Sequence, residues 1–228
     1  MYSSTPEHHT YSINMIFKTK YKAWIIAFML LSKIIVITML ILLCTSSADS
    51  DKYVLENIHG RTSIRNYSDD PVPDEKIREL LRAAMAAPSS RNVQPWLFYI
   101  VKDREKLDRL AAGLPYAKML GHAQLAIVVC GDTGKGSPNE EQKMNWVMDC
   151  SAATQNLLLA AHALGLGAVW TGVYPYAERM HVVRETLQIP DHVIPLNVIP
   201  IGYPAEYPTP KDKWNPENIV SGFDAKAD

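Results

Sequence analysis

The sequence has few cysteines, no excess of charge and no pattern of metal ligands. Its 228 residues include 3 cysteines, and Cys44, Cys130 and Cys150 are too widely spaced for a disulfide framework or a zinc site. The 23 basic and 24 acidic residues leave a formal net charge of −1, which offers no basic surface for nucleic acid. The 7 histidines show no metal-ligand spacing, and no nucleophile-elbow motif is present. These absences argue against nucleic-acid binding, metalloenzyme and hydrolase functions.

Residues 23–44 form a long apolar run that is interrupted by Ser32 and Lys33. A run of this length is enough to span a bilayer. However, Lys33 would lie near the middle of the span, at a cost of about 2.5–3.5 kcal/mol on insertion. A start of translation at Met29 would instead make the run a signal peptide, with residues 46–48 as its cleavage site. An export signal, an uncleaved membrane anchor and a start further downstream remain open.

The location of the protein depends on this segment. Lys18, Lys20 and Lys22 precede the apolar run, and the positive-inside rule would then place the rest of the chain outside the cytoplasm. A downstream start would leave the protein in the cytoplasm. We therefore treat residues 1–50 as a signal peptide or N-terminal membrane anchor, and we expect residues 51–228 to form one domain.

The rest of the chain alternates between helical and strand-like patterns, which indicates a layered fold of the α/β or α+β class. Asp74 is expected to cap the first helix, and two prolines, Pro195 and Pro200, predict that the last strand lies at the periphery of the sheet. The longest helix is apolar on nearly every side in its second half, which predicts burial centrally or against another subunit. Helices are predicted at residues 74–87, 104–112, 140–164 and 177–187, and strands at 97–101, 125–130, 168–173 and 193–201.

Two glycine-rich segments do not fit nucleotide-binding motifs. Gly165 and Gly167 lie where a helix leads into a strand, whereas the dinucleotide-binding turn leads from a strand into a helix. These glycines are predicted to end the preceding helix. Residues 131–137 lack the spacer and the hydroxyl residue after lysine that a P-loop requires.

Two polar clusters flank the first predicted helix. Residues 61–65 combine two arginines with two hydroxyl side chains, which suit a phosphate group. Residues 88–96 place hydroxyls and amides on a loop between a helix and a strand, where they could bind a polyhydroxylated heteroaromatic ligand. Taken alone, the first cluster also fits a solvated surface, and the second also fits a well-packed turn.

Two further clusters lie in the second half of the chain. Residues 164–172 lead a strand to Gly172, where a flat ligand could approach the backbone closely. Residues 200–204 are followed by Lys211 and Lys213, two cations that could return to a phosphate. In this order the four clusters resemble the FMN-dependent nitroreductase family, and the resemblance extends over residues 54–220.

The resemblance implies an α+β fold with a central, mostly antiparallel sheet flanked by helices. It also implies an intertwined homodimer with FMN at the interface, in which the proline-rich residues 203–228 form an extended C-terminal arm around the partner. The residues implied in cofactor binding are Arg61, Thr62, Ser63, Arg65, Pro88, Ser89, Ser90, Asn92, Gln94, Thr171, Gly172, Lys211 and Lys213.

Each cluster has an implied role toward FMN. Residues 61–63 would hold the phosphate and the ribityl chain, and Arg65 would face the N1/O2 edge of the flavin. Ser89, Ser90 and Asn92 would come from the other subunit, with Gln94 nearby, and the backbone at residues 171–172 would point an N–H group at flavin N5. Lys211 and Lys213 would contact the phosphate, although the family has an arginine at the second position and a lysine lacks its bidentate fork.

The resemblance implies hydride transfer from NAD(P)H through flavin N5 to a nitroaromatic, a quinone or a similar electron-poor acceptor. No side chain is expected to act as a catalytic acid or base, and no metal is expected. Tyr116, Met119 and Trp146 are candidates for lining the substrate pocket. Two alternatives remain open: a reductive dehalogenase of the same fold, and an exported flavin-binding or electron-carrier protein without enzymatic activity. The leader segment favours the carrier, because NAD(P)H is not available outside the cytoplasm.

Overall fold

The structure is a computed structural model that describes residues 24, 28–35, 37–38, 52–135, 139 and 143–220. The chain divides into two units, residues 1–56 and residues 57–228. The described residues of the first unit are helical and exposed. No helix in this described part of the chain is long and apolar enough to cross a membrane. The predicted leader, residues 1–50, lies largely outside the described residues, so its role stays a prediction.

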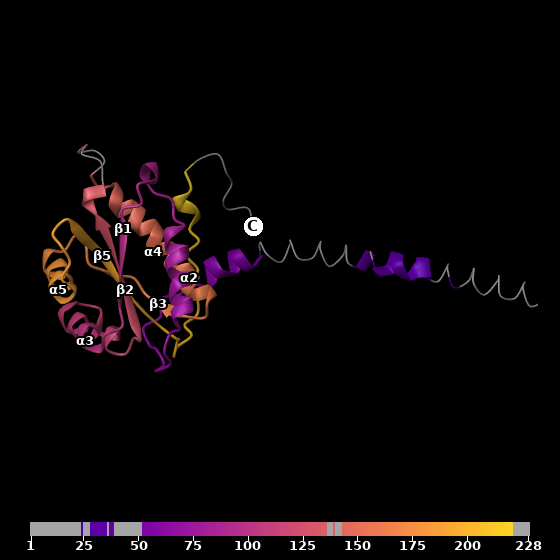
Figure 1. Ribbon diagram of the computed structural model, residues 1–228, viewed down its shortest axis with the longest axis horizontal. Coiled ribbons are helices and arrows are strands. Elements are labelled where there is room, and N and C mark those ends of the chain that lie inside the picture. The colour runs from indigo at the N-terminus through magenta and orange to yellow at the C-terminus, as the bar shows by residue number, and fades with distance from the viewer. Residues whose placement is uncertain are drawn as a thin grey trace, which may run out of the picture. The chain divides into compact units, whose positions relative to one another are not determined.

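The second unit is built on an antiparallel sheet (Figure 1). Its strands are β1 (Trp96–Val101), β2 (Leu125–Asp132), β3 (Gly167–Ala168), β4 (Thr171–Gly172) and β5 (Val193–Gly202). The order is β1-β2-β5-β3, and β4 also pairs with β5. All these pairs are antiparallel. The predicted strand at residues 168–173 is therefore two short strands that are separated by residues 169–170.

The prediction of a peripheral last strand is wrong, because β5 lies in the interior of the sheet between β2 and the short strands. Its two prolines fall where the hydrogen-bonding ladder is interrupted. Pro195 adjoins a β-bulge, since the register with β2 passes from Asn197 to Pro195 and leaves Leu196 without a partner. Pro200 lies level with the gap between β3 and β4. Interruptions in the ladder thus allow prolines in a central strand.

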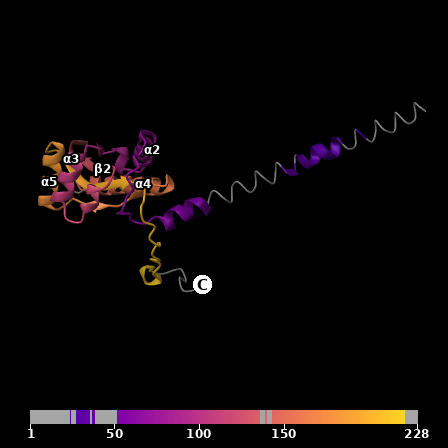
Figure 2. The same cartoon turned by 90° about the horizontal axis from the view of Figure 1, so that it is seen from below.

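The sheet separates two hydrophobic cores. Leu125, Ile127 and Val129 of β2 pack into one core with helices α2 (Asp74–Met85) and α4 (Asn145–Ala163). The alternating residues of β2 pack into the other core with α3 (Arg104–Gly113) and α5 (Ala177–Leu187). The two pairs of helices lie on opposite sides of the sheet in both views (Figures 1 and 2). This arrangement explains why residues 125–130 of β2 are all apolar, and it confirms the predicted α+β fold.

The helices differ from the predictions at their ends. The predicted cap of the first helix is wrong, because Pro73 occupies the N-cap position of α2. Asp74 is the first residue of the helix, where it forms an ion pair with Lys102. Helix α4 begins at Asn145, and residues 140–142 of the predicted helix lie outside the described residues. Within a single chain α4 is also not buried on every side, because its residue Met148 is 63% exposed. At its C-terminal end Gly165 has a φ of 71°, which confirms the predicted role of this glycine, whereas Gly167 belongs to β3.

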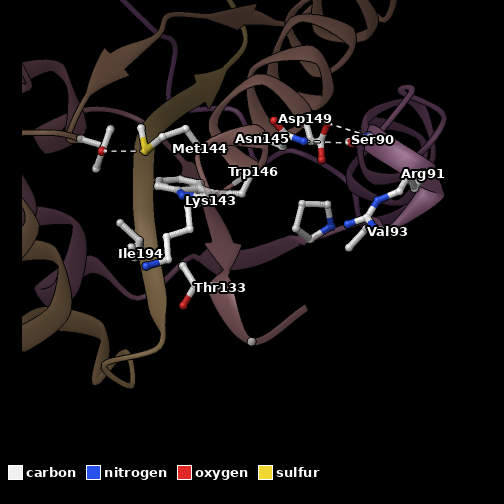
Figure 3. Close-up of a pocket in the computed structure, with 13 residues that line it drawn as sticks. Ser90, Arg91, Val93, Thr133, Lys143, Met144, Asn145, Trp146, Asp149 and Ile194 are labelled. Atoms are coloured by element: carbon white, nitrogen blue, oxygen red, sulfur yellow. Dashed lines mark hydrogen bonds between the residues drawn. The ribbon is translucent and has the colours of Figure 1, made fainter. Parts of the chain in front are cut away.

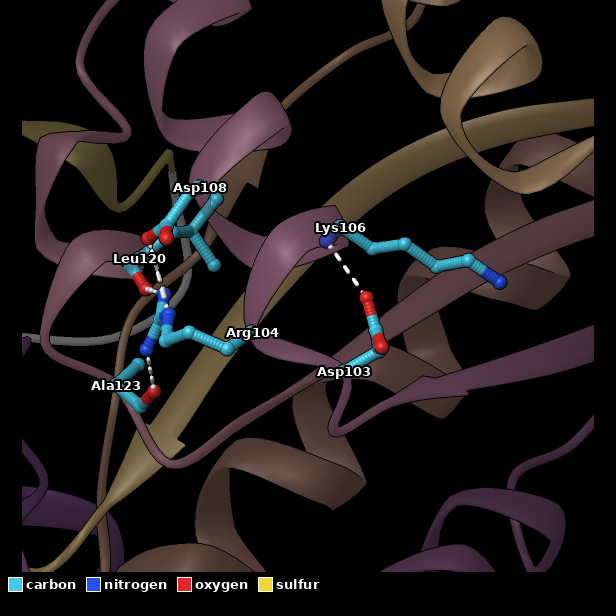
Figure 4. A network of polar contacts seen from close by, with 6 residues as sticks. All are labelled: Asp103, Arg104, Lys106, Asp108, Leu120 and Ala123. Atoms are coloured by element: carbon cyan, nitrogen blue, oxygen red, sulfur yellow. Dashed lines mark hydrogen bonds and ion pairs between the residues drawn. The ribbon is translucent and has the colours of Figure 1, made fainter.

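Polar contacts join the start of α3 to the 3₁₀ turn at residues 118–121 (Figure 4). The Asp103 carboxylate caps the helix by accepting a hydrogen bond of 2.9 Å from the backbone N–H of Lys106. Arg104 donates from Nε to Asp108 at 2.9 Å and from its terminal nitrogens to the carbonyl oxygens of Leu120 and Ala123. These contacts fix the connection that leads into β2.

Candidate functional site

A cavity of about 900 Å³ joins the two predicted phosphate-binding clusters. One side consists of residues 58–65 and the other of residues 208–214. We call it the cationic cavity. Arg61, Thr62, Ser63, Arg65, Lys211 and Lys213 all line it. The fold therefore brings together side chains that are far apart in the sequence.

A short pairing of backbone segments brings the two sides of the cationic cavity together. Tyr67 forms an antiparallel bridge with Pro204, and hydrogen bonds of 2.9 Å join Ser68 N to Tyr203 O and Ala205 N to Asn66 O. Residues just before this pairing carry Arg61 and Arg65, and residues just after it lead to Lys211. The pairing therefore sets the separation of the cationic groups.

The Glu206 carboxylate reinforces this pairing. It accepts hydrogen bonds from the backbone N–H groups of Arg65 and Asn66 at 2.6 and 3.1 Å, and from the Asn66 side-chain amide at 2.7 Å. These hydrogen bonds, of which the one from the Arg65 backbone is the largest influence, hold the pKa of Glu206 below its ordinary value. Glu206 thus acts as an ionised clamp beside the cavity.

Close packing holds the same segment against the sheet. Ile64 N donates to Ala168 O of β3 at 3.1 Å, and the buried Tyr67 hydroxyl donates to Ile64 O at 2.7 Å. A Cβ atom at Gly167 would lie 2.6 Å from the Ile64 side chain, so glycine is required for this approach. The wall that carries the arginines is therefore fixed by backbone contacts.

The cationic cavity carries unbalanced positive charge. Arg61, Arg65, Lys211 and Lys213 line it together with one acid, Asp212. The Asp212 carboxylate accepts a hydrogen bond from the Trp214 backbone at 2.9 Å. Among the residues that the structure describes, the side chains of Arg61, Lys211 and Lys213 form no hydrogen bond or ion pair. Four neighbouring cations repel one another, and a bound polyanion would relieve this repulsion.

The predicted backbone contact at residues 171–172 lies on β4. The Thr171 hydroxyl donates to the Val198 carbonyl, so this side chain is engaged within the sheet. Arg179 Nη1 donates to the Gly172 carbonyl at 3.0 Å, and its guanidinium lies 3.8 Å from the centre of the Tyr176 ring. A Cβ atom at Gly172 would meet nothing closer than Trp170 Nε1 at 3.9 Å. The surface over Gly172 is therefore open, and Arg179 binds the Gly172 carbonyl, which belongs to the following peptide unit.

A second cavity, of about 650 Å³, lies at the end of the sheet where α4 begins (Figure 3). We call it the aromatic cavity. The rings of Trp146 and Tyr174 lie edge to face there, with centroids 5.0 Å apart. A Cβ atom at Gly131 would lie 2.2 Å from the Trp146 ring, so Trp146 packs directly on the β2 backbone. It is lined by Ser90, Arg91, Val93, Pro95, Thr133, Gly134, Lys143, Met144, Asn145, Trp146, Asp149, Tyr174 and Ile194.

The loop that forms one wall of the aromatic cavity has a constrained backbone. Arg91, Asn92 and Gln94 have φ values of 51°, 57° and 52°. This left-handed conformation costs roughly 1–2 kcal/mol for a residue other than glycine. The loop is held by Ser90, whose backbone N–H donates to the buried Asp149 carboxylate at 2.9 Å and whose hydroxyl accepts from Asn145 Nδ2 at 3.0 Å.

The remaining loop residues bond to one another. The Ser89 hydroxyl accepts from Gln94 N at 3.0 Å, and Gln94 Nε2 donates to Asn92 Oδ1 at 2.8 Å. Pro88 precedes them in the sequence and lies beyond the end of α2 at Met85. In one chain the loop therefore forms its own unit, and none of its residues lines the cationic cavity.

The three predicted substrate-pocket residues do not come together. Trp146 lines the aromatic cavity, but Tyr116 is 83% exposed, and Met119 packs against the hydrophobic cluster of Ile64 and Tyr67. Tyr116 and Met119 therefore do not line the aromatic cavity within the described part of a single chain, and the contact of these three side chains with a substrate stays a prediction.

Sequence reasoning singled out Ser90 and Trp146 and missed the other residues of the aromatic cavity, Asp149 and Arg91 among them. Asp149 has a sequence signal, since it is an isolated acid in an otherwise apolar helical stretch, and such a side chain needs a polar partner when buried. Arg91 lies inside the predicted polar cluster at residues 88–96, but nothing in the sequence distinguishes it from any other surface cation.

Comparisons with known proteins identify the family to which the chain belongs. A sequence model of the nitroreductase family matches residues 58–114 and 111–203. The chain belongs to the nitroreductase family. A protein of Methanothermobacter thermautotrophicus named "Putative NADH dehydrogenase/NAD(P)H nitroreductase" is 50% identical over 166 residues, which are 73% of this chain and 85% of that protein.

Solved structures of nitroreductases share the fold. A protein of Parabacteroides distasonis that carries the same name is 56% identical, with a TM-score of 0.70, over 75% of this chain and 98% of that one. An FMN-dependent nitroreductase from Clostridium difficile is 31% identical, with a TM-score of 0.67, over 74% of this chain and 99% of that one. The resemblance inferred from the four polar clusters is thus confirmed at the level of family and fold.

Proposed function

We propose that this nitroreductase-family chain is an FMN-dependent oxidoreductase that passes hydride from NAD(P)H to electron-poor acceptors such as nitroaromatics and quinones. One observation carries the proposal: the cationic cavity gathers residues 61–65 and residues 211–213 around one space. The relatives named for FMN and NAD(P)H support the same conclusion.

The donors in the cationic cavity fit the phosphate and ribityl chain of FMN. Arg61 offers a guanidinium fork to phosphate, and Lys211 and Lys213 add two point charges. The hydroxyls of Thr62 and Ser63 match the polyhydroxylated ribityl chain. Within the described residues, Arg61 and the two lysines have no side-chain partner, which supports this assignment because their charge would be met by the ligand.

FMN, when bound, supplies hydride transfer through its N5 atom. The chain itself would bind and orient the cofactor, and no side chain would exchange a proton with the substrate. Arg65 would place positive charge at the N1/O2 edge, where negative charge develops on reduction. Arg179 holds the Gly172 carbonyl, which lies in the peptide unit directly after the one that would face N5.

A homodimer would complete the site. Within one chain the loop at residues 88–94 stands apart from the cationic cavity, so we assign its contacts with FMN to the partner subunit. Residues 207–220 are exposed apart from Pro216, which fits an arm that embraces a second copy. Sedimentation equilibrium should give the mass of a dimer, and a stable monomer that still retains FMN would refute the shared site.

The experiment that tests the proposed function is an anaerobic titration of the purified full-length chain. We expect the visible flavin band to bleach with NADH or NADPH and to return on addition of 4-nitrobenzoate or a quinone. A yellow protein that neither nicotinamide reduces would contradict the oxidoreductase and favour a flavin carrier. A colourless protein that cannot be reconstituted with FMN would contradict the cofactor assignment.

A further inference from the structure

The aromatic cavity has the properties of a ligand site, and the cofactor assignment uses only Ser90 among the residues that line it. We propose that this cavity binds the electron acceptor, and that Arg91 selects flat aromatic molecules that carry a carboxylate or another anionic group. That the ligand is an acceptor rests on the proposed function. That it is an aromatic anion rests on the geometry of the cavity.

The floor of the cavity suits a flat ring. Trp146 is 5% exposed and is held in place by its packing on Gly131, so its indole is a rigid surface. Tyr174 meets it edge to face, and Val93 and Ile194 extend the apolar lining. A volume of about 650 Å³ lies within the range of sites that take small aromatic ligands.

The charges around the cavity select an anion. The described residues of its lining include two cations, Arg91 and Lys143, and one acid, Asp149, and Lys143 already takes part in another interaction within the chain. The Asp149 carboxylate is buried and accepts the Ser90 N–H, so its charge serves to hold the loop. In the part of the chain described by the structure, the Arg91 guanidinium forms no hydrogen bond or ion pair. A carboxylate on the ligand would supply a bidentate partner for it.

The backbone of the loop supports a binding role for Arg91. Arg91 is held at a φ of 51° between anchors, since Asp149 and Asn145 fix Ser90 on one side and Ser89 binds Gln94 on the other. Strained backbone of this kind persists where the surrounding structure enforces it, and it clusters at ligand sites. Figure 3 shows Arg91 at one side of the cavity, with Lys143 and Thr133 on the other.

The binding test uses two probes of equal shape that a flavin does not reduce, 2-naphthoate and neutral 2-naphthamide. Calorimetry with the full-length protein as purified should show naphthoate binding about tenfold tighter than naphthamide. Arg91→Gln should remove this preference, and Arg91→Lys should keep part of it. Arg82→Gln, on the exposed face of α2, is the control variant and should leave the preference unchanged.

A second variant separates the ring from the charge. Val93→Phe would fill part of the cavity, so it should weaken both naphthalene probes by the same factor and leave their ratio unchanged. Equal affinity of the two probes in the wild type, or a preference that survives Arg91→Gln, would overturn the proposal.

The acceptor role is tested by turnover with NADH. For 4-nitrobenzoate we expect Arg91→Gln to raise KM about tenfold with little change in kcat, and for 4-nitrobenzamide we expect no change in either. Loss of selectivity in binding without any change in KM would overturn the acceptor role. Binding through Arg91 in a protein that reduces neither acceptor would refute the proposed function and leave the aromatic-anion site standing.

Discussion

The cationic cavity and the aromatic cavity are built in opposite ways. The cationic cavity is formed by two segments distant in sequence, and among the described residues the side chains of Arg61, Lys211 and Lys213 have no hydrogen-bond or ion-pair partner. The aromatic cavity is formed where α4 packs on the sheet, and Trp146, Tyr174 and the anchored loop define it rigidly. The cationic cavity would therefore suit a phosphate through its charge, and the aromatic cavity would suit a flat ring through its shape.

The two cavities should respond differently to substitution. Replacing a lysine or arginine of the cationic cavity with a neutral residue should remove an interaction with the ligand and leave the fold intact. Altering the floor of the aromatic cavity disturbs packing, because its walls are also parts of the hydrophobic core. Stability and binding are therefore separate measures of the two regions.

The largest effect on stability is expected at Gly131. In Gly131→Ala the new methyl group would lie 2.2 Å from the buried Trp146 ring, so the ring or the strand would have to shift. We expect the free energy of unfolding to fall by about 3 kcal/mol. Chemical denaturation would measure this change, with Gly121→Ala as the control because nothing lies within 4 Å of its Cβ position. Equal stability of the two variants would contradict the rigid floor.

The next effect concerns the phosphate. We expect the double variant Arg61→Gln/Lys211→Gln to bind FMN about 100-fold more weakly, because two charge-assisted contacts are lost, and to bind riboflavin almost as the wild type does. Quenching of flavin fluorescence measures both affinities. The matched control is Arg82→Gln/Lys106→Gln, which removes the same charge from exposed helical positions. An equal loss for both flavins would show that these residues do not contact the phosphate.

A smaller effect is expected from the anchor of the loop. Asp149→Ala leaves the Ser90 N–H without its partner, which should lower the free energy of unfolding by about 2 kcal/mol. Asp149→Asn keeps an accepting oxygen and should recover more than half of this loss. If both variants were as stable as the wild type in thermal denaturation, the anchor would not hold the loop.

The smallest effect is the pH dependence at Glu206. Its pKa is lower in the folded chain than in the unfolded chain, so its contribution to stability is present above the unfolded pKa and is lost as the pH falls through the folded pKa. We expect Glu206→Gln to lower Tm at neutral pH, and we expect the difference from wild type to shrink in acid. Glu185→Gln serves as the control, because Glu185 is an exposed residue of α5. A difference in Tm that grows in acid would contradict the clamp.

Local patterns predicted much of the fold. The bounds of α5 and the buried run of β2 follow from periodicity and length, and the four polar clusters were enough to identify the family. The central position of β5 could not be predicted, because its prolines are tolerated through a bulge at Leu196 and a gap between β3 and β4 that appear only in the sheet. Local sequence does not report the register of distant strands.

The candidate site divides in the same way. Residues 61–65 and 211–213 were predicted as phosphate ligands, and the fold brings them to one cavity. The aromatic cavity was missed apart from Ser90 and Trp146, since it depends on Asp149 reaching a loop 59 residues away in the sequence. Charge clusters are visible in a sequence, whereas a cavity between a helix and a sheet is visible only after packing.

The most direct test is a crystal structure of the full-length chain with FMN bound. The phosphate should lie within hydrogen-bonding distance of Arg61 and Lys211, with the flavin ring over Gly172 and the loop at residues 89–92 supplied by a second copy. The aromatic cavity should remain free for the acceptor. A phosphate bound elsewhere, or a flavin ring seated on Trp146, would contradict the assignment of the two cavities.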